Sequence, residues 1–268
     1  MQLDLTGRVV VVTGAARGIG RVIAATFVRE RAVVVGVDVT ADGLGWLDDA
    51  RVAAGLEGAS LACDVTDGDR TRALVAEVVA RFGRVDVLVN NAGVNVEGTL
   101  EELSDHDWDR CFAVNVGGVF KMCRAVVPVM KAQRSGRIVN AASFAAIVPS
   151  VGAGAYAASK AAVVQLTRTL AGELGPWGVT ANAYAPGMVP TAMNGFADLP
   201  ATAQDRLLDT LTLRRWSDPQ EVADVVVFLA SDAARYVTGT VLDVSGGKLA
   251  TQLPQKAYEQ PDAQALHA

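Results

Sequence analysis

The sequence contains few of the residues on which several common kinds of site depend. Three cysteines in 268 residues are too few for a disulfide scaffold, and their spacing matches no metal-binding pattern. The two histidines, His106 and His267, lie outside any strongly patterned segment, which leaves little for a zinc site or a histidine-based triad. We therefore expect no metal centre, and reduced cysteines in a cytoplasmic protein.

Runs of positive charge are also missing. The formal net charge is −5, and no cluster of lysine and arginine occurs, which argues against nucleic acid or an anionic membrane as a partner. The first five residues include an aspartate and lead into a predicted strand, so we expect no signal peptide. The stretch 138–159 has no charge and is long enough to span a membrane. Its polar, proline and glycine residues instead predict a strand, a loop and the start of a helix.

The hydrophobic residues, 51% of the chain, form short valine-rich segments that alternate with amphipathic ones. Strands are predicted at 8–12, 32–39, 59–63, 85–89, 137–142, 178–185 and 240–244. Helices are predicted at 18–30, 44–54, 68–81, 105–131, 156–174 and 218–231. This alternation is typical of one α/β domain with a parallel sheet.

The segment 8–20, RVVVVTGAARGIG, joins a buried strand to a glycine-rich turn and a helix start. Gly14, Gly18 and Gly20 allow a tight turn and close approach of the backbone to a ligand, and free N–H groups at the helix start attract a pyrophosphate. Glycines also mark ordinary turns. However, Asp38 ends the next valine-rich strand, where its carboxylate can accept hydrogen bonds from the adenosine ribose. The segment therefore predicts a dinucleotide site.

Polar residues follow the later predicted strands. The fourth strand ends in 90–93 (NNAG), Ser143 follows the fifth, and Pro186-Gly187 ends the sixth. Tyr156 and Lys160 are four residues apart and share one helix face. Taken singly, each has an ordinary alternative as a turn, a loop residue or a solvated helix face. Since ligands bind beyond the carboxyl ends of the strands in open α/β sheets, we expect these residues to gather there.

One residue of the long predicted helix at 105–131 is out of place. Asn115, followed by Gly117-Gly118, is locally unfavourable inside a helix. Such a conflict between local preference and context suggests a packing or functional reason for the asparagine.

Taken together, these motifs resemble the short-chain dehydrogenase/reductase family. TGAARGIG, NNAG, Asn115, Ser143, the YxxxK of Tyr156 and Lys160, PG with Thr191 beyond, and a closing SGG occur in the family's order and separations. The resemblance implies a single Rossmann-fold domain at 1–248, with a doubly wound parallel sheet of seven strands in the order 3-2-1-4-5-6-7 and helices on both faces. The polar tail at 249–268 lies outside the family pattern.

The resemblance also implies hydride transfer between a nicotinamide and a secondary alcohol or ketone. Tyr156 would be the general acid and base, its pKa lowered from near 10 by Lys160 and the oxidised nicotinamide. Lys160 would also hold the nicotinamide ribose, Ser143 would steady the substrate oxygen, and Asn115 would complete a proton relay. The expected cofactor contacts are Gly14, Arg17, Gly18, Ile19, Gly20, Asp38, Asp64, Val65, Asn91, Ala92, Gly93, Tyr156, Lys160, Pro186, Gly187, Val189 and Thr191.

We predict that the cofactor is NAD rather than NADP. Asp38 would face the 2′-phosphate of NADP, and like charges at about 4 Å cost up to roughly 4 kcal/mol at an effective dielectric constant of 20. Arg17, just before Gly18, is the counter-argument, because a basic residue there can hold that phosphate. A non-catalytic dinucleotide-binding sensor is the alternative from another functional class, since fold alone does not establish catalysis. A serine hydrolase is disfavoured, since Ser143 has no GxSxG context.

The segment 187–217 loses the alternation of strands and helices, and a loop of that length is typical of a lid. Its apolar residues, with Val94, Phe144 and Val151, predict a mainly apolar pocket in which only Arg214 or Arg215 could pair with a charged substrate. We therefore expect an uncharged secondary alcohol or ketone. The runner-up is an NADPH-dependent 3-oxoacyl thioester reductase.

We also expect a homotetramer. The family resemblance implies that the helices at 105–131 and 155–174 pair across two-fold axes, which would give closed D₂ symmetry. Small and apolar residues such as Ala161, Ala162 and Gln165 fit an outer face there, although the same residues could simply be core.

Overall fold

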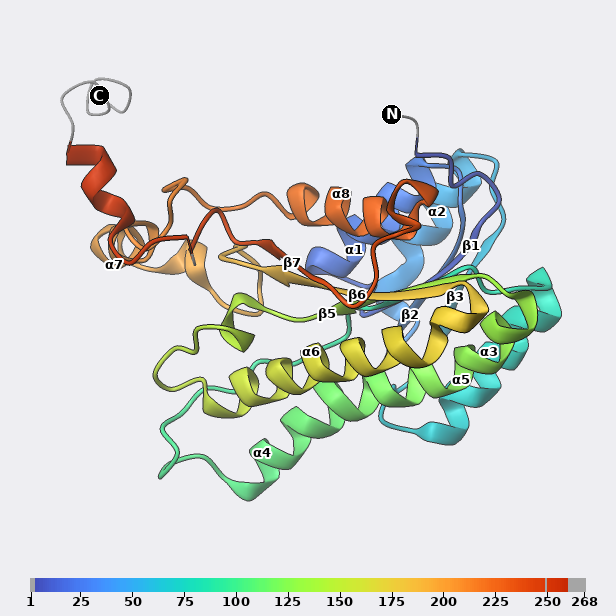
Figure 1. The fold of residues 1–268 in the computed structure, drawn as a ribbon, viewed down its shortest axis with the longest axis horizontal. Helices are drawn as coiled ribbons and strands as arrows, with labels where there is room; N and C mark the ends of the chain where they lie inside the picture. The colour runs from blue at the N-terminus through green and yellow to red at the C-terminus, as the bar shows by residue number, and fades with distance from the viewer. Residues whose placement is uncertain (1–2, 249, 260–268) are drawn as a thin grey trace.

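The computed structural model describes residues 3–248 and 250–259, which build one parallel sheet between two layers of helices (Figure 1). The sheet order is β3-β2-β1-β4-β5-β6-β7, which confirms the predicted order. The strands are β1 Val9–Thr13, β2 Val33–Asp38, β3 Gly58–Ala62, β4 Val87–Asn90, β5 Gly136–Ala141, β6 Val179–Pro186 and β7 Val241–Val244. Every neighbouring pair is parallel, so the carboxyl ends of all the strands meet at one edge.

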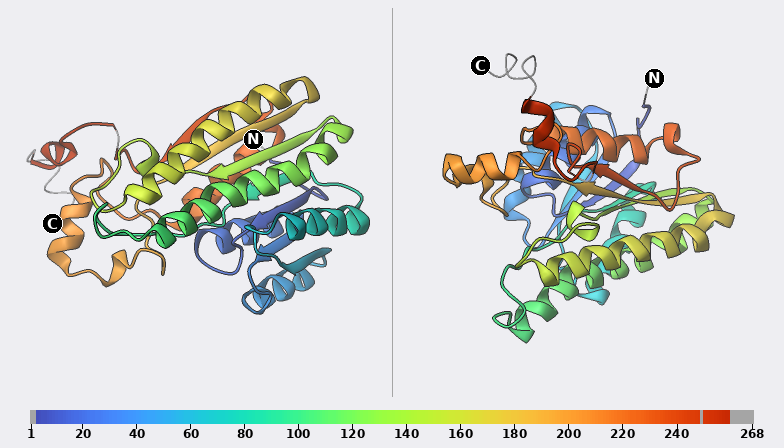
Figure 2. Two further views of the ribbon diagram at one scale, coloured as in Figure 1. Left: turned by 90° about the horizontal axis from the view of Figure 1, so that it is seen from below. Right: turned by 60° about the vertical axis from the view of Figure 1, so that its left-hand side comes forward.

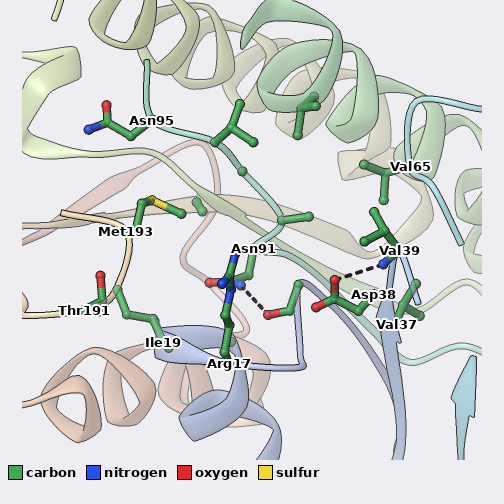
Figure 3. A pocket seen from close by; sticks show the side chains of 18 of the residues that line it. Arg17, Ile19, Val37, Asp38, Val39, Val65, Asn91, Asn95, Thr191 and Met193 are labelled. Atoms are coloured by element: carbon green, nitrogen blue, oxygen red, sulfur yellow. Dashed lines mark hydrogen bonds between the residues drawn. The ribbon is translucent and has the colours of Figure 1, made fainter. Parts of the chain in front are cut away.

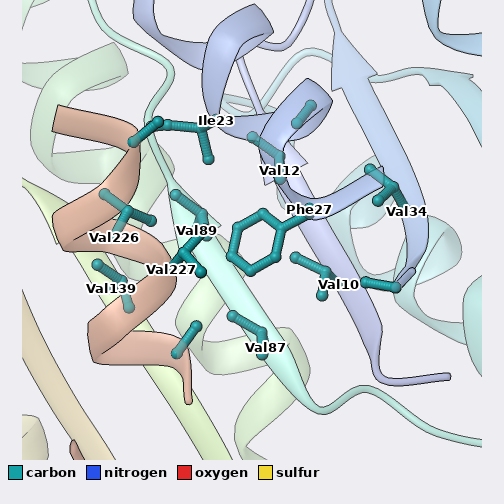
Figure 4. Packing of buried hydrophobic residues seen from close by; sticks show 14 of the residues in the cluster. Val10, Val12, Ile23, Phe27, Val34, Val87, Val89, Val139, Val226 and Val227 are labelled. Carbon is teal, nitrogen blue, oxygen red and sulfur yellow. The ribbon is translucent and has the colours of Figure 1, made fainter. Parts of the chain in front are cut away.

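Helices cover both faces of the sheet (Figures 1 and 2). One layer contains α1 Gly18–Arg29, α2 Gly45–Ala53 and α8 Pro219–Ala230, and the other contains α3 Gly68–Phe82, α5 Val119–Gln133 and α6 Gly154–Leu174. Successive side chains of a strand point to opposite faces, so Val10 and Val12 join the first core while Val9 and Val11 join the second. Figure 4 shows Phe27 of α1 seated among valines of the sheet and of α8. Both faces of β1 are therefore buried, as its run of valines predicts.

The long helix predicted at 105–131 has three parts. α4 Asp105–Phe112 is followed by a π-helical turn, Ala113–Gly118, and then by α5. The turn contains the buried Asn115. A Cβ at Gly118 would lie 2.7 Å from the Val65 side chain, so this wider turn packs tightly against the segment that follows β3. π-Turns inside α-helices are frequent at functional sites, which gives a structural reason for the unfavourable asparagine.

Two stretches are long and apolar enough to raise the question of a membrane span. The charge-free stretch 138–159 divides into β5, the 3₁₀ turn η3 Phe144–Ala146 and the start of α6, as expected. The helical stretch Asp105–Gln133 meets the length and hydropathy of a span, a test that core helices also pass. Here α5 packs against α3 and β5, and α4 packs against α6.

The segment predicted as a lid has structure of its own. It contains the 3₁₀ turn η5 Phe196–Asp198 and the helix α7 Ala201–Leu208. Sequence analysis missed α7, which has no fully buried residue and hence no strong apolar stripe. The rings of Phe196 and Trp216 stack with centroids 5.6 Å apart and so join the two ends of the segment. Of the tail beyond residue 248, the structure describes 250–259, which include the 3₁₀ helix η7 Pro254–Glu259.

Candidate active site

A cavity of about 770 Å³ lies at the carboxyl ends of the strands (Figure 3), within the usual range of roughly 300–1,000 Å³ for small-molecule sites. Its lining includes every expected cofactor contact except Gly187 and Val189. It also includes residues that sequence analysis did not assign to the cofactor: Val37, Val39, Cys63, Thr66, Val94, Asn95, Arg110, Ala113, Val114, Ala141, Ala142, Tyr184, Ala192 and Met193. Residues at or just after the ends of six strands, β1 to β6, thus line one concave site.

The glycine turn between β1 and α1 borders this cavity. Gly14 and Gly18 have φ angles of 67° and 57°, in the left-handed region that favours glycine. A Cβ at Gly20 would overlap Gly14 O and the Asn91 side chain. The first N–H groups of a helix have no intrahelical acceptor, and the N-cap Arg17 makes no capping hydrogen bond with its side chain. The turn therefore fits a pyrophosphate.

The NNAG segment after β4 is tied to this turn by hydrogen bonds. The backbone N–H groups of Asn91 and Ala92 donate to Thr13 Oγ1, at 3.0 and 3.1 Å. Asn91 Nδ2 donates to the carbonyl oxygens of Thr13 and Gly14, at 3.1 and 3.2 Å. The side chain of Asn91 therefore holds the glycine turn in place.

Asp38 lies at the end of β2 and faces the same cavity (Figure 3). Its Oδ2 accepts a hydrogen bond from Ala16 N, and its Oδ1 accepts one from Val39 N, both at 2.9 Å. The first bond connects the carboxylate to the glycine turn, so its position is fixed relative to the turn. Arg17 lines the cavity as well. The site therefore contains a cation, Arg17, that would favour a 2′-phosphate, and an anion, Asp38, that would repel it.

Tyr156 and Lys160 lie one turn apart on α6. The Lys160 side chain is buried, its Nζ donates to Ala141 O at 2.8 Å, and it lies 5.7 Å from the centroid of the Tyr156 ring. Burial lowers the pKa of Lys160 to about 8. Ser143 is the N-cap of η3, where its Oγ accepts from Ala145 N at 3.1 Å, and it is also hydrogen-bonded to Tyr156. Strand β5 and helix α6 thus bring three of the four predicted catalytic side chains together.

The pKa of Tyr156 differs from the expectation. Burial raises it above the ordinary value for a tyrosine, and the hydrogen bond with Ser143 opposes that effect only in part. A lowered pKa therefore requires a positive charge beyond those that the protein supplies, such as that of an oxidised nicotinamide. A phenol protonated at neutral pH is the form that can donate a proton to a carbonyl oxygen.

Asn115 lies behind this group, fully buried in the π-turn. Its Oδ1 accepts from Val94 N at 2.8 Å, and its Nδ2 donates to Val94 O and to Ser159 Oγ, both at 3.0 Å. A Cβ at Gly93 would lie 3.2 Å from Asn115 Oδ1 and 3.5 Å from Lys160 Nζ. Both polar atoms thus border the space where a side chain at position 93 would lie. This arrangement suits a proton relay between Asn115 and Lys160.

Two expected cofactor contacts have other surroundings. A Cβ at Gly187 would lie 2.5 Å from Ser245 Cα, so this glycine lets β6 approach the end of β7. Val189 is 2% exposed and belongs to the hydrophobic core. Its carbonyl oxygen accepts a hydrogen bond from Asn194 Nδ2, which fixes the start of the lid segment.

Among the lining residues that sequence analysis missed, Tyr184 of β6 has the clearest role. It is fully buried, and its hydroxyl donates to Asn91 Oδ1 at 3.0 Å. Tyr184 therefore orients the amide that holds the glycine turn. The only signal in the sequence was its place near the end of a predicted strand. That signal was weak, because a tyrosine at such a position usually belongs to the hydrophobic core.

We expect Tyr184→Phe to raise the KM for the nicotinamide cofactor about 3- to 10-fold, because losing one buried hydrogen bond costs about 0.5–1.5 kcal/mol. The value of kcat should change little, since the hydroxyl is hydrogen-bonded to Asn91, which is not one of the four predicted catalytic residues. Steady-state kinetics would measure both. Tyr236→Phe is the control, because that side chain is fully exposed. An unchanged KM would remove Tyr184 from cofactor positioning.

Comparisons with known proteins agree with this geometry. Residues 14–248 match the family model described as enoyl-(acyl carrier protein) reductase. The 3-oxoacyl-[acyl-carrier-protein] reductase of Thermotoga maritima is 42% identical over 247 residues, which cover 91% of this chain and 99% of that protein. A candidate short-chain alcohol dehydrogenase from Sinorhizobium meliloti has a similar structure, with a TM-score of 0.89 and 34% identity over 94% of this chain and all of that one. A candidate NAD(P)-dependent gluconate 5-dehydrogenase from Beutenbergia cavernae, with bound NADP, has a TM-score of 0.88 and 39% identity over 94% and 100% of the two chains.

Proposed function

Since this chain belongs to the short-chain dehydrogenase/reductase family of oxidoreductases, which act on alcohol and keto groups, we propose that it interconverts 3-oxoacyl and 3-hydroxyacyl thioesters with NAD(H). The observation that carries this proposal is the grouping of Ser143 with Tyr156 and Lys160, two residues that line the large cavity. A binding protein without catalysis has no physical need to keep these groups together. The intact set therefore argues against a dinucleotide sensor.

The protein's own residues provide the acid–base part of the reaction. A bound nicotinamide supplies or accepts the hydride. In the direction of reduction, the Tyr156 hydroxyl donates its proton to the carbonyl oxygen, while Ser143 orients that oxygen by a hydrogen bond. Lys160 holds a positive charge beside the phenol and stabilises the phenolate that remains. Asn115 orders the proton relay that returns a proton to Tyr156.

The relatives support the thioester as substrate. The reductase from Thermotoga maritima is named for a 3-oxoacyl thioester, and the match covers nearly all of that protein. This comparison favours a 3-oxoacyl thioester, the runner-up of the sequence analysis, over the uncharged secondary alcohol or ketone as substrate. The second candidate is kept because the candidate alcohol dehydrogenase from Sinorhizobium meliloti also matches over its full length, and because Met193 gives the cavity an apolar side chain.

A substrate panel tests the two candidates directly. Purified protein would be assayed with 3-oxobutanoyl thioesters and with uncharged secondary alcohols and ketones, and the absorbance of the reduced nicotinamide would be followed. Turnover of the thioesters at the higher kcat/KM is the expected result. Preference for the uncharged ketones would support the second candidate. Binding of the nicotinamide without turnover of any substrate would support a sensor.

The position of Asp38 supports NAD(H) as the cofactor. Its carboxylate is held at the end of β2 by the bond from Ala16 N, where a ribose is expected and a 2′-phosphate would be repelled. Two observations favour NADP instead. Arg17 lines the cavity, and the Beutenbergia cavernae structure contains bound NADP. The family binds either nicotinamide, so the preference of this chain depends on which of the two charges dominates.

We expect the wild type to have the higher kcat/KM with NADH, and Asp38→Asn to lower the ratio of NADH to NADPH efficiency at least about tenfold. Removing the charge removes a repulsion of up to roughly 4 kcal/mol at about 4 Å. Initial rates with both cofactors would measure the ratio. Asp64→Asn is the matched control, since this carboxylate also lines the cavity. Equal or better efficiency of the wild type with NADPH would contradict the proposal.

The quaternary structure proposed is a homotetramer built through α4, α5 and α6. Trp108 of α4 and Phe120 of α5 are 37% and 47% exposed, so aromatic side chains remain uncovered on that face of one chain. We expect light scattering to give about four times the chain mass of 27.9 kDa, and Phe120→Asp to lower it. Val52→Asp on α2, where the side chain is 72% exposed, is the control. A monomeric wild type would be the contrary result.

A cytoplasmic location is part of the same proposal. Cys63, Cys111 and Cys123 are free and buried, which suits a reducing compartment. Fractionation of cells that express the full chain would test this location.

A further inference from the structure

A second cavity, of about 740 Å³, lies between α7 and the described part of the C-terminal tail. It shares no lining residue with the first cavity. Its wall includes Val148, which follows the catalytic serine by five residues, and Lys248, whose Nζ lies 5.0 Å from the centroid of the Phe144 ring. The cavity therefore lies next to the turn η3 that Ser143 caps.

Two cations of this second cavity have no carboxylate partner among the described residues. Arg206 of α7 and Lys248 both line it, and neither forms an ion pair with any residue in the part of the chain that the structure describes. Asp209 also lines it, but Arg214 Nε binds the Asp209 carboxylate at 2.9 Å. The cavity thus retains a surplus of positive charge.

The ion pairs of the lid segment correct the expectation from sequence about which cations could bind a charged substrate. Arg214 and Arg215 are the two cations that the sequence offered for a charged substrate. Arg214 instead binds Asp205 and Asp209, and Arg215 binds Glu221 at 2.6 Å. Among the described residues, Arg206 and Lys248 of the second cavity have no such ion pair.

Lys248 is held in a fixed position there. It is partly buried, and its Nζ donates to Thr210 Oγ1 at 2.7 Å. Burial lowers the pKa of Lys248, which means that its ammonium form lacks sufficient compensation from the protein. An anion placed next to the ammonium would provide that compensation. Side-chain amides and hydroxyls from the tail, such as Gln255, add hydrogen-bonding groups around it.

The tail is docked firmly enough to form a wall of this cavity. Tyr258 Oη donates to Thr212 O at 2.7 Å, and Pro254 is buried. Thr212 Oγ1 in turn donates to Gly247 O at 2.9 Å. The cavity is therefore built jointly by the lid segment and by a tail that lies outside the family motifs.

We propose that this second cavity is a subsite for the phosphate at the far end of the substrate's carrier arm, bound by Lys248 and Arg206. The proposal rests on the proposed function, because a 3-oxoacyl thioester has its reacting carbonyl near one end and its carrier at the other. With the carbonyl at Tyr156, the carrier extends out of the first cavity past η3. Two unpaired cations and several hydrogen-bond donors form a site suited to a phosphate.

The test compares two thioesters with the same acyl group. 3-Oxobutanoyl coenzyme A carries phosphates on its arm, whereas 3-oxobutanoyl N-acetylcysteamine is neutral. We expect Lys248→Gln and Arg206→Gln each to raise the KM for the coenzyme A thioester about tenfold, because each variant loses a charge-assisted hydrogen bond to the phosphate. The value of kcat and all constants for the neutral thioester should stay unchanged. Arg235→Gln, at an exposed arginine away from the cavity, is the control. Equal effects on both thioesters, or none, would overturn the proposal.

Binding without turnover separates this subsite from the proposed function. Calorimetry would compare pantetheine 4′-phosphate with pantetheine on the wild type and on Lys248→Gln. If only the phosphorylated compound binds, and the variant loses it, the subsite stands even when no thioester is reduced. If inorganic phosphate binds as tightly as pantetheine 4′-phosphate, the cavity takes free anions and the proposal fails. Reduction of both thioesters with no preference for phosphate would leave the proposed function intact and overturn the subsite.

Discussion

Tyr156→Phe is expected to lower kcat by a factor of about 10² to 10⁴, the usual contribution of general acid–base catalysis. The substitution removes the one hydroxyl that is hydrogen-bonded to Ser143 and lies on the same helix face as Lys160. The ring remains, so its packing against Lys160 and the shape of the cavity should persist. The affinity for NAD(H), measured by fluorescence titration, should therefore stay nearly constant while turnover falls.

The direction of the pKa shift sharpens this expectation. Because burial raises the pKa of Tyr156, the phenol is protonated at neutral pH and is suited to donate a proton during reduction. Tyr184→Phe provides a comparison, since it also removes a buried hydroxyl but should affect KM rather than kcat. Near-normal turnover of Tyr156→Phe would exclude this residue from the mechanism.

The architecture could be predicted from the sequence because its signals are local and repeated. A strand such as β1 is a run of valines, which only a sheet covered on both faces can bury. The capping box at Asp218 and Glu221 predicts the start of α8, and the structure contains both of its hydrogen bonds. The strand order came from the family resemblance, because no local pattern specifies which strands become neighbours.

The site could be predicted only where its residues end a strand or share a helix face. Asp38 ends β2, Asn91 follows β4, and Ser143 lies two residues beyond β5, so a parallel sheet brings them to one edge. Sequence analysis singled out Asn115 as unfavourable in a helix but predicted one continuous helix, and it missed the π-turn, in which Gly118 packs against Val65. Tyr184 was missed because its function depends on a contact with Asn91, more than ninety residues away in sequence.

The charge of the substrate region was the least predictable feature. Arg214 and Arg215 are adjacent, and nothing in the sequence shows that Asp205, Asp209 and Glu221 neutralise them in the folded chain. Ion pairing depends on the path of the lid and on helix α7, which was itself missed. Sequence analysis named Arg214 and Arg215, which the folded chain pairs with carboxylates, and its expectation of an uncharged substrate rested on the apolar residues of the lid segment.

Gly20→Ala is expected to weaken NAD(H) binding roughly 10- to 100-fold, since overpacking a tight site costs about 1–3 kcal/mol. The new Cβ would overlap Gly14 O and the amide of Asn91, two groups joined by a hydrogen bond that holds the glycine turn. The turn must then move away from α1. The N–H groups at the start of α1 would no longer converge on a pyrophosphate. Fluorescence titration of NADH would measure the loss of affinity.

Gly172→Ala separates this steric effect from a general effect of placing alanine in a helix. Gly172 lies in the exposed part of α6, and a Cβ there would meet no atom within 4 Å. Alanine should stabilise that helix by up to about 1 kcal/mol and leave the affinity for NADH unchanged. Equal affinities of the two variants would contradict the role of Gly20. Weaker binding by Gly20→Ala alone, with the fold retained by circular dichroism, would locate the pyrophosphate at the start of α1.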